Sequence, residues 1–72
     1  MKIGETIDVA WYAGRPEQVM VEGTVSALPD SLTVRPGHVR VRHTKQQLRQ
    51  AGLSGCGGVW TFPLSQIQGI DC

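Results

Sequence analysis

Apolar and polar residues alternate along three stretches of this chain, and this two-residue repeat constrains its fold more than any other feature. The stretches are residues 5–12, 18–28 and 38–43. Successive side chains of a β-strand point to opposite faces, so alternation predicts strands with one buried face and one exposed face. In the first stretch the buried side chains are Ile7, Val9 and Trp11. The pattern as a whole predicts an all-β fold.

The stretch 18–28 carries a glycine on the side that is expected to be buried. Val21 and Val25 point inward, whereas Glu22 and Thr24 point outward. Gly23 occupies an inward position, and a glycine there predicts a bulge or a sharp bend, by which a small barrel curls a strand.

The segment 32–43 has two interpretations. Leu32 begins a third strand, and the Pro36–Gly37 pair suits the two central positions of a type II turn. Such a turn would divide the segment into a hairpin. The same pair could instead form a bulge within one long strand.

A single short helix is predicted after the third strand, over residues 45–51. Thr44 is its N-cap, Gln47 completes a weak capping box, and Gly52 ends it. The remaining elements are a short strand at 59–62, a single turn at 63–66 and a last strand at 67–70.

This succession of elements resembles an SH3-like barrel. The resemblance rests on the strands at 19–27 and 32–43, the strand at 59–62, the turn at 63–66 and the strand at 67–70. It implies a small barrel of five or six strands with a 3₁₀ turn before the last strand. Here a short helix is inserted in the loop 44–58, before the penultimate strand, where the family usually has a tight loop. A five-stranded OB-type barrel is the competing all-β interpretation.

The length of the chain bounds its organisation and partners. Its 72 residues are expected to form a single domain, residues 1–72, which buries only about 60% of the surface of the unfolded chain. Because so small a core is often stabilised by a partner subunit, a homo-oligomer is one of the expected possibilities. No apolar run approaches the roughly 18 residues of a membrane span, and no signal peptide is recognisable, so a cytoplasmic protein without membrane contact is expected. Cys56 and Cys72 are expected to be free thiols, with a disulfide between them as the alternative.

Charge is distributed unevenly along the chain. Residues 1–34 carry two cations and five acids, a net charge of −3, whereas residues 35–72 carry five cations against Asp71, a net charge of +4. Within 38–43, the repeat places Arg40 and Arg42 on one strand face. Such asymmetry points to an anionic partner.

The candidate site follows from this cationic segment. Arginine and lysine side chains neutralise phosphates, and exposed aromatic rings stack on bases. The candidate phosphate contacts are Arg35, His38, Arg40, Arg42, Lys45 and Arg49, and the candidate stacking residues are Tyr12 and Trp60. The alternative is a structural role for the same cations: they lie on a solvated strand face, or they form cross-strand ion pairs with Asp8 and Glu22.

Catalytic and metal chemistry find little support in the sequence. The two histidines and two cysteines match no zinc-ligand spacing, so no metal site is expected. The Gly-rich run 55–58 precedes a strand rather than a helix, which argues against a phosphate loop. Cys56 is not followed by a helix N-terminus that could activate it as a nucleophile. A monomeric enzyme or a cofactor is not expected, although an oligomer could assemble a site at a symmetry axis.

The sequence thus predicts a non-enzymatic binding module. The first hypothesis is a nucleic-acid-binding or nucleic-acid-associated regulator, with DNA or RNA as its partner. The alternative is a small protein-interaction module, an inhibitor or an adaptor, that docks on a charged partner such as an acidic protein.

Overall fold

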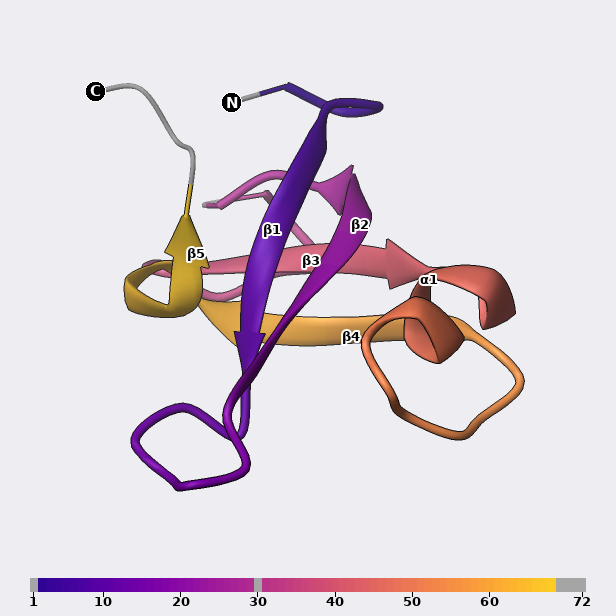
Figure 1. The fold of residues 1–72 in the computed structure, drawn as a ribbon. Coiled ribbons are helices and arrows are strands. Elements are labelled where there is room, and N and C mark those ends of the chain that lie inside the picture. Colours follow the sequence, from indigo (N-terminus) through magenta and orange to yellow (C-terminus); the bar gives the residue numbers. More distant parts are fainter. Residues whose placement is uncertain (1, 30, 69–72) are drawn as a thin grey trace.

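The computed structural model describes residues 2–29 and 31–68 and is predominantly β (Figure 1). The elements are β1 (Thr6–Trp11), β2 (Val19–Ala27), β3 (His38–His43), α1 (Lys45–Gln50), β4 (Gly58–Pro63), the 3₁₀ turn η1 (Leu64–Gln66) and β5 (Ile67–Gln68). The all-β class and the short helix before β4 agree with the sequence.

The strands form one antiparallel sheet in the order β4-β3-β2-β1-β5. The four longer strands make up most of it, and β5 adds only a two-residue pairing to β1. Figure 1 shows β1 crossing β3 and β4 at a steep angle, so the sheet curls over its inner face. Among the described residues no strand pairing joins β4 to β5, so the sheet is open, and a closed barrel stays a prediction.

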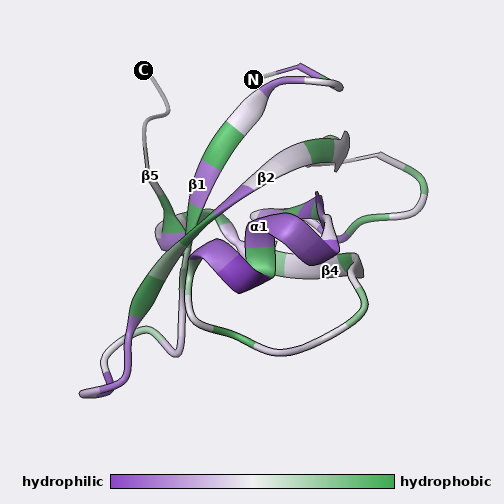
Figure 2. Cartoon of the chain, turned by 45° about the vertical axis from the view of Figure 1, so that its right-hand side comes forward, coloured by the Kyte–Doolittle hydropathy of each residue, from purple (hydrophilic) through white to green (hydrophobic). Residues whose placement is uncertain are grey.

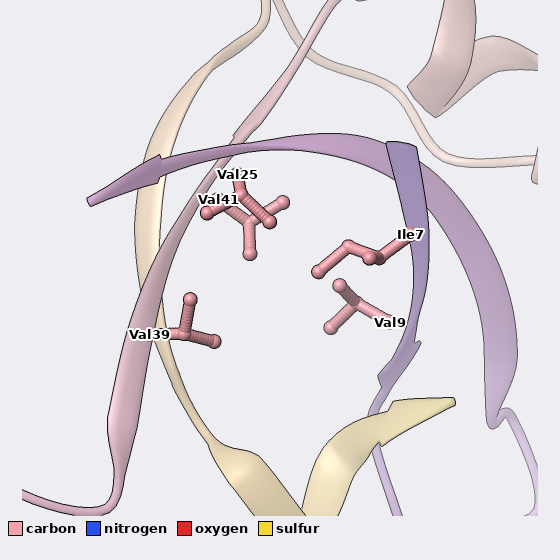
Figure 3. Close-up of a cluster of buried hydrophobic side chains, with 5 residues drawn as sticks. All are labelled: Ile7, Val9, Val25, Val39 and Val41. Carbon is pink, nitrogen blue, oxygen red and sulfur yellow. The ribbon is translucent and has the colours of Figure 1, made fainter. Parts of the chain in front are cut away.

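The core lies inside this curl. Its five central side chains come from β1, β2 and β3 and point toward one another in Figure 3. They are Ile7, Val9, Val25, Val39 and Val41. Trp11, Phe62 and Ile67 are half-buried around them. The buried positions predicted at Ile7, Val9, Val21 and Val25 are therefore confirmed. Ala10, which precedes the half-buried Trp11, is buried as well at 5% exposure.

The expected strand beginning at Leu32 is wrong, because the chain forms consecutive turns there. The backbone N–H of Val34 donates to the carbonyl of Ser31 at 3.3 Å. The N–H of His38 donates to the carbonyl of Arg35 at 3.3 Å around Gly37, whose φ is +76°. This second turn has the glycine position of the type II turn, but no strand precedes it. Val34 is buried in this loop instead.

The predicted capping box of α1 is present. Gln47 N–H donates to Thr44 Oγ1 at 3.1 Å, and Thr44 N–H donates to Gln47 Oε1 at 2.9 Å. Leu48 is the buried side chain of this short helix. No helix in the described part of the chain is long and apolar enough to cross a membrane.

The end of the chain follows the expected order over the residues that can be described. The turn η1 is a 3₁₀ turn, as predicted, and β5 begins at Ile67. The predicted continuation of the last strand to residue 70, and the pairing of Cys72, lie outside the described residues.

Candidate anion-binding site

The alternation of β3 separates cations from the core. Val39, Val41 and His43 are fully buried, and Arg40 and Arg42 project from the opposite face, here called the outer face. The chain then enters α1, which is hydrophilic over most of its length in Figure 2. Arg42, near the end of β3, is therefore followed closely along the chain by Lys45 and Arg49 of α1.

Arg42 lies at a shallow hollow of about 370 Å³ on the outer face. The hollow is lined by Ile3, Gly4, Thr24, Val25, Ser26, Arg42 and Thr44. Thr24 is directly opposite Arg42 in the β2–β3 ladder. Because Thr44 Oγ1 accepts the bond from Gln47, its own hydroxyl proton stays available to a ligand. The hollow therefore offers one guanidinium and three hydroxyl groups.

Two more cations lie on α1, which follows β3 along the chain. Lys45 and Arg49, one helical turn apart, line an open hollow of about 600 Å³ together with Gln46 and Gln50. Within residues 2–29 and 31–68, neither cation forms an ion pair, and Arg42 forms none either. These three cations, Arg42, Lys45 and Arg49, define what we call the cationic surface.

Two other candidate residues are used by the fold. Arg40 Nη2 donates to the carbonyl of Thr33 at 3.0 Å and so fastens the 31–37 loop. His38 Nδ1 lies 3.0 Å from the carbonyl of Pro36, which can only accept, so Nδ1 donates. Arg35 is exposed in the same loop, three residues before β3 begins. The sequence pattern did not reveal these two hydrogen bonds, because both depend on the turns of the 31–37 loop.

The acidic residues of the outer face lie beside one another. Asp8 and Glu22 are directly opposite in the β1–β2 ladder, and both are exposed. Among the described residues they form no ion pair with the cations of β3 or α1, and the ion pair that is present joins Arg15 to Glu17 at 3.9 Å. Two carboxylates in this position repel each other, so the outer face has an acidic side and a cationic side.

The two candidate stacking residues are not joined to the cationic surface. Trp60 is opposite Val41 in the β3–β4 ladder, so its side chain is on the inner face. Its ring lies 5.1 Å from that of Trp11. Tyr12, 47% exposed, lies where β1 ends and has a φ of +57°. An aromatic ring and a phosphate contact therefore do not form one continuous patch here.

His43 is the polar residue whose importance the sequence did not reveal. It is fully buried, and Nε2 accepts a 3.0 Å bond from Trp11 Nε1 while Nδ1 lies 2.8 Å from the carbonyl of Glu22. Burial lowers the pKa of His43, although the bond to Glu22 opposes this shift. Its inward place among valines was the available signal, because a buried polar side chain requires partners.

Metal and thiol chemistry gain no site from the geometry. Within the described residues, no three His, Cys, Asp or Glu side chains gather as metal ligands. Cys56 is an exposed free thiol.

Comparisons with protein-family models, with curated proteins and with solved structures found no match for this chain. Its function is therefore inferred from the site alone.

Proposed function

We propose that this protein is a non-enzymatic module that binds the phosphate backbone of DNA or RNA through the cationic surface. An SH3-like barrel is the architecture we propose for it. The proposal rests chiefly on Arg42, whose guanidinium has no acidic partner among the described residues and which lines one hollow together with three hydroxyl-bearing side chains. A guanidinium binds two phosphate oxygens with parallel bonds, and neighbouring hydroxyls donate to the others.

Lys45 and Arg49 support the same proposal because they continue the positive charge beyond β3. They have three and five further N–H donors, respectively, and neither side chain is paired with a carboxylate in the part of the chain that the structure describes. A surface of three free cations neutralises about three phosphates, so log Kd should change with log salt with a slope of about 3 on duplex DNA. The absence of a joined stacking platform favours backbone contacts with little base preference.

The test measures fluorescence anisotropy of labelled random-sequence DNA and RNA, single- and double-stranded, between low and moderate salt. Arg42→Ala should weaken binding and reduce the salt slope by about one. Arg15→Ala is the matched control, because Arg15 is exposed and already paired with Glu17. Failure of the wild-type protein to bind any of these nucleic acids at low salt would overturn the proposal.

One observation favours the alternative, a module that docks on an acidic protein. Val59, 46% exposed, is directly opposite Arg42 on the outer face. An apolar side chain beside an arginine suits a protein interface. Such a partner would give a shallow salt slope, and Val59→Ser would then weaken binding as much as Arg42→Ala.

A further inference from the structure

The strand β4 forms one edge of the sheet. Within the described residues, its backbone pairs with β3 on one side and with no strand on the other. It is six residues long, whereas the opposite edge, β5, is a two-residue strand. Unpaired backbone groups along an edge strand are a template for another strand. The groups that β4 leaves free can be derived from its pairing with β3.

Backbone groups in an antiparallel strand face its two neighbours alternately. Leu64 N–H donates to the carbonyl of Gly37 at 2.9 Å, which extends the β3–β4 ladder by one step. The even-numbered residues of β4 therefore face β3. The N–H and C=O groups of Val59 and Thr61 face the free edge, and Pro63 adds a carbonyl there without a donor.

We propose that β4 of one copy pairs with β4 of a second copy in an antiparallel, two-fold symmetric dimer. Two identical antiparallel strands are related by a two-fold axis, so the same groups serve both copies. With the axis at Trp60, Val59 is opposite Thr61 of the partner subunit. Each such pair exchanges two hydrogen bonds, about four in all, and every free N–H of this edge is satisfied.

The side chains of β4 fit this register. The strand contains no charged residue, so no like charges meet at the axis. On the outer face, the Val59–Thr61 pairs across the axis join β-branched side chains, which pack well on a pleated surface. Edge strands usually avoid pairing by means of charges, bulges or proline. In β4 the single proline is the last residue, beyond the segment that pairs.

The dimer also enlarges the outer face. Arg42 is opposite Val59, and Arg40 is opposite Thr61, in the β3–β4 ladder. Across the axis, Arg42 of one copy and Arg40 of the partner subunit would lie in one row, three strand spacings or about 14 Å apart. The partner is thus a second copy of this chain, and the inference does not depend on any nucleic acid.

The test is sedimentation equilibrium of the purified protein across a concentration series, without nucleic acid. Thr61→Pro removes the N–H that faces the free edge and leaves the ladder to β3 intact. Because symmetry removes this bond twice, the dimer Kd should rise about tenfold or more. Thr61→Val keeps the N–H and the shape, and should dimerise like the wild type.

A monomeric wild-type protein at several hundred micromolar would overturn the proposal, as would undiminished dimerisation of Thr61→Pro. Circular dichroism checks that this variant folds. Should it unfold, the double variant Val59→Lys/Thr61→Lys decides, since its edge charges repel across the axis while its backbone is unchanged. A dimer of normal affinity in that variant contradicts β4 pairing.

Discussion

Trp11 Nε1 donates a 3.0 Å hydrogen bond to Nε2 of His43, across 32 residues of sequence. An indole nitrogen can only donate, so Nε2 carries no proton, and the proton must be on Nδ1. Nδ1–H then donates to the carbonyl of Glu22 at 2.8 Å. The two bonds fix one neutral tautomer, joining β1, β2 and β3 at one buried ring.

This arrangement predicts that stability falls in mild acid. The lowered pKa of His43 means that the unfolded chain takes up a proton near the ordinary value of 6.5, whereas the folded protein resists it to a lower pH. The stabilisation is complete above pH 6.5 and is lost as pH falls toward the folded pKa. Urea unfolding at pH 7.5, 6.5 and 5.5 should show a decreasing free energy of unfolding.

His38→Gln is the matched control, because it removes the other histidine of β3 and should leave this decrease unchanged. His43→Gln should abolish most of the decrease. An equal free energy of unfolding for the wild type at all three pH values would contradict the assigned role of His43.

Gly23→Ala should destabilise the protein through a steric conflict with the same ring. A Cβ at this position would lie 2.5 Å from Val41 Cγ1 and 2.7 Å from His43 Cε1 and Nδ1. Both neighbours are fully buried, so they have little room to move. We expect the free energy of unfolding to fall by about 1–3 kcal/mol in urea titrations. Ser26→Ala, an exposed change in β2, should shift it by less than about 0.5 kcal/mol, and an equal effect of both variants would refute the steric cause.

Local patterns account for most of the fold that the sequence predicts. The two-residue repeat predicts β1, β2 and the buried face of β3, because strand pleating alone determines which side chains share a face. Thr44 and Gln47 predict the start of α1 for a similarly local reason. The segment from Leu32 departs from its predicted strand because Pro36 and Gly37 are compatible with several turns. In the observed turns, the carbonyl of Thr33 accepts a hydrogen bond from Arg40 of β3, a contact that the local sequence does not reveal.

The candidate site is predictable to a lesser degree for the same reason. Charge and alternation identify Arg42, but the hydroxyls of Thr24 and Ser26 come from β2, and only the strand register brings them to it. The sequence also placed Trp60 among the binding residues. Its position opposite Val41 puts it on the inner face, which depends on pairing between strands rather than on its own neighbours.

Arg40→Ala should loosen the 31–37 loop rather than act mainly on binding. Its guanidinium donates to the carbonyl of Thr33, and losing this bond costs about 1 kcal/mol. We expect faster amide hydrogen exchange at Val34, with a smaller loss of nucleic-acid affinity than Arg42→Ala causes. Arg49→Ala is the reverse control, since it should weaken binding and leave exchange in the loop unchanged. Equal loop protection in wild type and Arg40→Ala would contradict the role of this bond.

Thr24→Val distinguishes a built phosphate contact from charge alone. Valine keeps the size and branching of threonine, so β2 should keep its pairing, but the hollow beside Arg42 loses a hydroxyl. A hydrogen bond to a phosphate oxygen contributes about 1.5 kcal/mol, so affinity should fall about tenfold. The salt slope should stay constant because no cation is removed. Thr6→Val, an exposed change directly opposite Thr24 in β1, is the control. Unchanged affinity in Thr24→Val, with binding still sensitive to Arg42→Ala, would show that Arg42 acts through charge without the hydroxyl groups around it.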